Sequence, residues 1–272
     1  MNMALDERGE LIVHIEGIGW WSPGVADWTH AAALLRDGAP LPTAGEGKPA
    51  AAILAPNERR RAPAPVLLAC EVAAQACTMA ERAPDTLRCV FSSMHGDIGI
   101  TDDLCTTLAT SPLQVSPTRF HNSVHNAPVG HWTVATECHL PSNAVSALRG
   151  SFAAGLLESA VLACMDEAPV LFTAYDIAAQ GALAGVIPAA MPFGTALVIS
   201  PGRTARTLAT LRLRHLPHTA DEAPLPANYA AIVEATPIAN GLPLFSALAR
   251  SAYGQIQLPN GVSTSLSIEV TA

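Results

Sequence analysis

The sequence is poor in charged residues: Asp, Glu, Lys and Arg make up 14% of its 272 residues, whereas 50% are hydrophobic. Acidic residues outnumber basic ones by 23 to 15, which gives a formal net charge of −8. The longest basic run is Arg59–Arg61, and no aromatic residues alternate with it as a base-stacking surface requires. Because a phosphate surface repels a chain of this charge, we expect no binding to nucleic acid or to anionic membranes.

The sequence also lacks the patterns of export and of a membrane span. Its first residues show neither a basic start nor the long apolar run of a signal peptide. No charge occurs between Asp176 and Arg203, but Pro188 and Pro192 interrupt this stretch. Because proline breaks a spanning helix, we expect a buried loop that leads into a strand at residues 195–200. These features predict a cytoplasmic protein without a membrane span.

Cysteine pairs with metal-binding or redox spacing are absent. The six cysteines form no Cys-x-x-Cys, and their apolar surroundings predict free, mostly buried thiols in a reducing compartment. Among the nine histidines, His121 and His125 have the spacing of one helix face, as zinc ligands sometimes do. His121 precedes the expected helix, however, and the ligand set is incomplete. We therefore expect hydrogen-bonded histidines, with no metal and no cofactor.

Apolar strands and helices alternate along the chain. The patterns predict apolar strands at residues 11–18, 87–92, 170–175 and 195–200, a very short strand at 144–146, and possible edge strands at 207–215 and 263–270. They predict helices at residues 28–36, 64–82, 98–109, 123–135, 152–165, 229–235 and 244–252. Such alternation indicates an α/β protein, a layered α/β/α domain with a mainly parallel central sheet.

Several segments occur in an order that points to one family. They are Ile15–Gly19, Arg59–Arg61 before an Ala-rich helix, Phe91–Asp97, Ser116–Gly130 and Ser151–Leu156. Together they resemble the N-terminal half of β-ketoacyl synthases. The Ser-Val-His-Asn-Ala-Pro version at 123–128 is similar to the chain length factor proteins of aryl-polyene biosynthesis, a polyketide or fatty-acid-type pathway. The resemblance implies a thiolase-like (half-thiolase) fold, with residues 1–200 as the ketosynthase-like domain and 201–272 as an extension packed on it.

The resemblance also implies that this chain is not catalytic alone. Such enzymes carry a nucleophilic cysteine at the start of a buried helix, and two histidines in a C-terminal half. Here Ser151 or Phe152 stands at the nucleophile position, and the His-Gly-Thr-Gly-Thr block is missing. Phenylalanine cannot attack a thioester, and serine needs a base that the sequence does not show. The implied partner is a full-length ketosynthase in a heterodimer, supplied by an acyl carrier protein.

In the resembling enzymes, the loop matching Ser116–Gly130 crosses the dimer interface and reaches the partner's acyl tunnel. Here the segment combines aromatic and polar side chains, a mixture that favours an interface over a dry core. The residues expected at the tunnel wall and interface are Arg119, Phe120, His121, Val124, His125, Asn126 and Trp132. For Phe120, an ordinary buried aromatic of this subunit stays open as the other interpretation.

Two other functions stay open at this stage. A small acyltransferase or thioesterase could use Ser151 or Cys138, although Arg-Gly-Ser-Phe is not the Gly-x-Ser-x-Gly of a hydrolase elbow. A homodimeric scaffold or carrier-binding module would need no ketosynthase at all. His95 follows a strand, where a general base can lie, but we favour a tight turn with Gly96 at positive φ and Asp97 capping the next helix.

Overall fold

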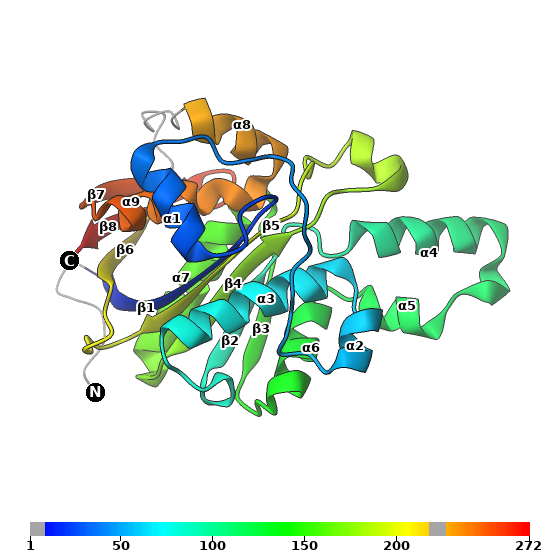
Figure 1. The fold of residues 1–272 in the computed structure, drawn as a ribbon, viewed down its shortest axis with the longest axis horizontal. Helices are drawn as coiled ribbons and strands as arrows, with labels where there is room; N and C mark the ends of the chain where they lie inside the picture. Colours follow the sequence, from blue (N-terminus) through cyan, green and yellow to red (C-terminus); the bar gives the residue numbers. More distant parts are fainter. Residues whose placement is uncertain (1–8, 218–226) are drawn as a thin grey trace.

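The structure, a computed structural model, describes residues 9–217 and 227–272. Within them one eight-stranded sheet runs through the molecule in the order β3-β2-β4-β5-β1-β6-β8-β7 (Figure 1). Its strands are β1 (Leu11–Trp21), β2 (Arg88–Ser92), β3 (Ser142–Val145), β4 (Val170–Asp176), β5 (Phe193–Ser200), β6 (Ala209–Pro217), β7 (Gly254–Pro259) and β8 (Thr264–Thr271). The expected parallel pairing holds for β2 with β3 and with β4, whereas the other neighbours are antiparallel, so the sheet is mixed.

Helices cover both faces of this sheet, which confirms the layered α/β/α architecture (Figure 1). They are α1 (Trp28–Asp37), α2 (Pro56–Arg61), α3 (Ala64–Met79), α4 (Ile98–Thr110), α5 (Pro117–Asn122), α6 (Ala127–Thr136), α7 (Ser151–Asp166), α8 (Ala227–Ala235) and α9 (Leu242–Arg250). One hydrophobic core lies between the sheet and α3 with α6, and a second between the sheet and α1, α7, α8 and α9. Helices α4 and α5 project from one end of the molecule (Figure 1).

The helix starts follow local capping chemistry. The Asp27 carboxylate accepts a hydrogen bond from the His30 backbone N–H at 2.8 Å and caps α1. The Asp97 carboxylate accepts one from Ile100 N–H at 2.9 Å and caps α4, and Gly96 has a φ of 66°. The tight turn predicted at residues 95–97 is therefore confirmed.

Glycine allows helices to lie unusually close to each face of the sheet. A Cβ on Gly19 of β1 would lie 1.9 Å from the carbonyl oxygen of Val72 in α3. On the opposite face, a Cβ on Gly155 of α7 would lie 2.6 Å from the ring of Phe172 in β4. Any larger residue would push either helix away from the sheet, so these glycines set the spacing of the layers.

Three expectations about elements need correction. The strands predicted as edges, now β6 and β8, are interior, because the unpredicted β7 pairs outside β8. The uncharged loop after Asp176 is largely exposed rather than buried, with Val186 among its exposed side chains. The helix expected from residue 123 begins at Ala127, since Pro128 favours the first helical turn.

A single stretch of the described residues, Leu148–Asp166, forms a helix long and apolar enough to cross a membrane. It contains α7 and the short turn before it. The share of its apolar window that is buried inside the protein is 56%. Because core helices pass the same test of length and composition, the stretch is accounted for by its place under the sheet.

The variant Gly19→Ala tests the spacing of α3 from the sheet. Its methyl group would overlap backbone atoms of α3 that cannot rotate away, so we expect a loss of about 3 kcal/mol or more in the free energy of unfolding. Gly130→Ala in α6 is the control, because nothing lies within 4 Å of its added Cβ. Urea unfolding measures both, and equal stability of Gly19→Ala and the native chain would contradict the argument.

Candidate functional site

Ser151, at the start of α7, has its hydroxyl fully engaged in local hydrogen bonds. The side chain is 1% exposed, and its Oγ donates to the carbonyl of Leu148 at 2.7 Å. The same Oγ accepts from the backbone N–H of Ala147 at 3.0 Å. No histidine, carboxylate or lysine of the described residues is hydrogen-bonded to it. Ser151 therefore holds the turn before α7 and lacks the base that a nucleophile needs.

Phe152, the other candidate for the nucleophile position, and Cys138, the alternative nucleophile between α6 and β3, are structural. The Phe152 ring is buried and packs edge-on against Phe172 and Phe245, with centroids 5.3 Å and 5.9 Å away. The Cys138 thiol is buried and lies 3.4 Å from the carbonyl of Leu87. Neither side chain is presented to a substrate.

Leu148 occupies the exposed position of the turn between β3 and α7. Its φ is 51°, in the left-handed region, and its side chain is 68% exposed. A sharp turn from strand to helix is where enzymes present a nucleophile, because the side chain there points away from the backbone around it. The exposed residue of this turn is Leu148, and Ser151 and Phe152, which we expected at the nucleophile position, follow it at the start of α7. A hydrocarbon side chain cannot attack a thioester.

Residues near the C-terminus cover the start of α7. The Asn240 side-chain amide donates to the carbonyl of Arg149. Gly150 lies so close to the loop after β7 that an added Cβ would be 2.7 Å from the backbone nitrogen of Gly261. Gly241 lies equally close to the Phe152 ring, since an added Cβ would be 2.4 Å from it. The segment after residue 236 therefore packs against the start of α7.

Asp176 forms the centre of a buried polar cluster at the carboxyl ends of β2 and β4. Its Oδ1 accepts from the Ser93 hydroxyl at 2.6 Å and from the Met94 N–H at 3.1 Å. Burial raises the pKa of Asp176 to about 7, against the opposing effect of these hydrogen bonds. The Nε2 of His95 is 3.9 Å from the same oxygen and is buried without a hydrogen-bond partner. Burial lowers the pKa of His95.

The loop that Asp176 holds, residues 93–97, also contacts two elements nearer the surface. The His125 Nε2 lies 3.0 Å from the carbonyl of Ser93, and Ser146 Oγ donates to the carbonyl of Met94 at 2.8 Å. The loop therefore joins the core to the α5–α6 connection and to the β3–α7 turn. Sequence reasoning missed Asp176 and Ser93. The available signal was a charged residue ending an apolar strand, since carboxyl ends of parallel strands meet.

The predicted interface residues divide into a surface group and one core residue. Arg119 pairs with Asp103 of α4 at 2.5 Å, and Phe120 is 64% exposed. The exposed or half-buried members of the group are Arg119, Phe120, His121, Val124, His125 and Asn126. Trp132, by contrast, is 0% exposed and packs on Phe91, because α6 turns this side chain towards α3 and the core. Its assignment to the interface is therefore wrong.

Further exposed apolar side chains extend this surface. We call it the α4–α5 surface and define it by Leu108, Leu113, Phe120 and Val124. Strand β3 lies at the edge of the sheet, and its Ser142, Asn143 and Ala144 are exposed. A sheet edge of this kind leaves backbone N–H and C=O groups free to pair with another strand.

Histidines and acidic residues do not gather into a metal site within the described residues: no group of three or more His, Cys, Asp and Glu is placed to hold an ion. His121 and His131 line one hollow of about 290 Å³ together with Glu58. His131 Nε2 lies 3.3 Å from the side-chain oxygen of Asn122. Burial and the neighbouring His121 lower the pKa of His131.

Comparison with known proteins identifies relatives of this arrangement. The family profile described as β-ketoacyl synthase, N-terminal domain, matches residues 28–236. No curated protein sequence matches the chain.

Several solved structures share the fold. The ketosynthase ApeO in complex with its chain length factor ApeC, from Xenorhabdus doucetiae, contains a chain that is 22% identical with a TM-score of 0.72. That match covers 95% of this chain and 99% of the other. A chain of the ishigamide ketosynthase/chain length factor is 13% identical, with a TM-score of 0.70, and the match covers 96% of this chain and 99% of the other. A chain of the type II polyketide synthase complex AntDE:AntF is 10% identical, with a TM-score of 0.72, and the match covers 96% of this chain and 99% of the other. These matches confirm the thiolase-like fold.

The variant Asp176→Asn tests the buried acid. A pKa raised above its ordinary value of 3.8 means that the folded state holds the proton more tightly than the unfolded state. This contribution to stability is fully present below pH 4 and is lost as the pH rises through about 7. The amide cannot ionise, and its oxygen keeps an acceptor for the Ser93 hydroxyl and the Met94 N–H. We therefore expect the variant to be more stable than the native chain at pH 8, by a few kcal/mol at most, with the gap closing towards pH 4.

Denaturant unfolding of both proteins from pH 4 to pH 8 measures that gap. Because the pKa of His95 is lowered in the folded state, its contribution to stability is lost as the pH falls, opposite to that of Asp176. Both proteins contain His95, so the difference between their stabilities largely removes its contribution. Asp85→Asn, at an exposed position, is the control. A stability difference independent of pH would show that Asp176 does not bind a proton in the folded state at neutral pH.

Proposed function

Because this chain belongs to the β-ketoacyl synthase N-terminal domain family, we propose that it is a chain-length-factor-like partner of a full-length β-ketoacyl-acyl carrier protein synthase. It pairs with that enzyme in a heterodimer and forms part of the wall of the acyl tunnel. The pathway is of the polyketide or fatty-acid type, such as polyene synthesis. The observation that carries the proposal is Leu148 at the turn before α7, where a catalytic chain needs a nucleophile.

The α4–α5 surface supports pairing on energetic grounds. Burying one large apolar side chain such as Phe120 or Leu113 stabilises a protein by about 1.5–3 kcal/mol, and here several remain in water. Exposed apolar patches of this kind mark protein–protein contacts. Asp103, paired with Arg119, and the exposed Asn126 add the polar rim that such interfaces have.

Strand β3 offers a second place for pairing, at the edge of the sheet. It is four residues long, pairs with β2 alone among the described strands, and contains no proline or lysine to block a further strand. The β3–α7 turn follows it directly, so a partner strand paired with β3 would bring the partner close to Leu148. In this arrangement the partner supplies the cysteine and histidines, and takes its acyl and malonyl units from an acyl carrier protein.

Three solved structures are consistent with this proposal: two contain a ketosynthase with a chain length factor, and the third contains a ketosynthase with an acyl carrier protein. The acyltransferase or thioesterase alternative finds no support at Ser151, whose proton goes to a backbone carbonyl. A homodimeric scaffold stays distinguishable by experiment, because it would assemble without a ketosynthase.

The isolated chain is expected not to condense acyl and malonyl thioesters. Leu148 offers no nucleophile and the Ser151 hydroxyl has no base beside it. Mass spectrometry of carrier-bound products checks this, first with the chain alone and then with its co-expressed ketosynthase. A complex whose ketosynthase has lost its nucleophilic cysteine serves as the control and should be inactive. Carbon–carbon bond formation by the isolated chain that survives Ser151→Ala would place the nucleophile elsewhere and end the partner proposal.

The variant Phe120→Ala tests the α4–α5 surface. A central aromatic anchor often contributes about 2 kcal/mol or more to binding, so the change should weaken assembly with the ketosynthase by roughly 30-fold. If Phe120 lines the tunnel instead, assembly persists and the products become longer. Gel filtration of mixed subunits and mass spectrometry of the products separate the two results.

Met165→Ala is the matched control for Phe120→Ala. Met165 is 73% exposed and lies at the end of α7 remote from the β3–α7 turn, so its loss should change neither assembly nor product length. Gel filtration of the native chain alone gives the baseline: a stable homodimer that ignores the ketosynthase would favour the scaffold. Unchanged assembly and unchanged products in Phe120→Ala would refute its assignment to the interface and tunnel.

A further inference from the structure

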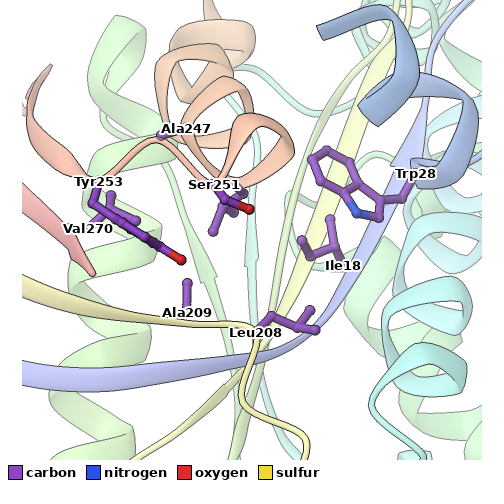
Figure 2. A pocket seen from close by; sticks show the side chains of 9 residues that line it. Ile18, Trp28, Leu208, Ala209, Ala247, Ser251, Tyr253 and Val270 are labelled. Atoms are coloured by element: carbon purple, nitrogen blue, oxygen red, sulfur yellow. The ribbon is translucent and has the colours of Figure 1, made fainter. Parts of the chain in front are cut away.

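A small hollow lies on the side of the molecule where β6 and β8 continue the sheet (Figure 2). Its volume is about 200 Å³, and its walls come from β1, α1, β6, α9 and β8. The apolar side chains of Ile18, Trp28, Leu208 and Val270 line it together with polar groups, and no charged residue lines it. In Figure 1 this side, marked by α9 and β8, is separated from α4 and α5 by the width of the sheet.

Two hydroxyl groups face this apolar hollow. Ser251 ends α9 with a φ of 49°, and Tyr253 follows before β7. Figure 2 shows both hydroxyls directed into the space between the apolar walls. Neither hydroxyl is hydrogen-bonded to another of the described residues, so both are available to a bound molecule. A concave apolar site with few convergent polar groups is the usual form of a small-molecule site.

The size and lining of the hollow restrict what it can hold. An apolar cavity of about 150 Å³ accommodates benzene, so about 200 Å³ suits a molecule of roughly eight non-hydrogen atoms. An ion would lose its hydration without gaining a charged partner, which excludes carboxylates and amines. A hydroxyl group on the ligand can exchange hydrogen bonds with Ser251 and Tyr253, each of which donates and accepts.

We propose that this hollow is a binding site for a small uncharged alcohol or phenol, a single ring or short chain with one hydroxyl group. The ring or chain contacts Ile18, Trp28 and Val270, and the hydroxyl reaches Tyr253 and Ser251. The site does not overlap the α4–α5 surface, so the inference does not depend on the function proposed above.

Titration with 4-methylphenol tests the site. A ligand of this size is expected to bind with a Kd of the order of 1 mM, which ligand-observed NMR measures. The half-buried Trp28 should change its fluorescence on binding, whereas the other tryptophans are buried away from the hollow. Toluene, which lacks the hydroxyl, should bind more weakly, and 4-methylbenzoate, which carries a charge, should not bind.

Three variants locate the binding. Ala247→Phe fills the hollow and should abolish binding, and Leu208→Trp at its exposed mouth gives the same result without touching the core. Tyr253→Phe removes one hydrogen bond and should weaken binding by about two- to tenfold. Ala184→Phe, in the exposed groove beside Leu148, is the control and should leave the Kd unchanged. The proposal is overturned if 4-methylphenol does not bind, or if it binds both Ala247→Phe and Leu208→Trp as it binds the native chain.

Discussion

The spacing between the sheet and its two inner helices is the constraint on which the rest of the structure depends. Gly19 lets α3 approach one face, and Gly155 lets α7 approach the other, each at a distance that excludes a methyl group. With α7 fixed in this way, the Ser92 hydroxyl donates to the carbonyl of Ser151 at 2.6 Å and anchors the first turn of the helix. The backbone bend at Leu148, and hence the exposed leucine, follows from where that helix must start.

Much of the fold was predictable because its elements are encoded locally. Apolar runs identified the buried parts of β1, β2, β4 and β5, and side-chain caps marked the starts of α1 and α4. Strand order was not predictable, since β6 pairs with β1 across a long stretch of sequence that periodicity does not describe. Strand β7 was missed although its Gln-Ile-Gln-Leu alternates polar and apolar residues, because this alternation covers only four residues.

The candidate site was only partly predictable for a similar reason. The mixture of polar and apolar residues around Phe120 and Val124 favoured an exposed interface, and both side chains are exposed. The residues around Trp132 are similarly mixed, yet its side chain is buried. Which face of α6 meets α3 is a tertiary fact. At the turn before α7, the left-handed φ of Leu148 has no sequence signature, because such a conformation in a non-glycine residue is imposed by its surroundings.

Strand β3 has a consequence for how the protein must be produced. The open sheet edge at β3 is a template for association with any other open edge, including that of a second copy, and the exposed apolar side chains of the α4–α5 surface add to this tendency. A chain synthesised in excess of whatever covers that edge would be drawn into aggregates or removed by proteases. On the function proposed above, the ketosynthase covers this edge, and synthesis of the two chains in equal numbers is then the simplest way to keep this chain folded and in solution.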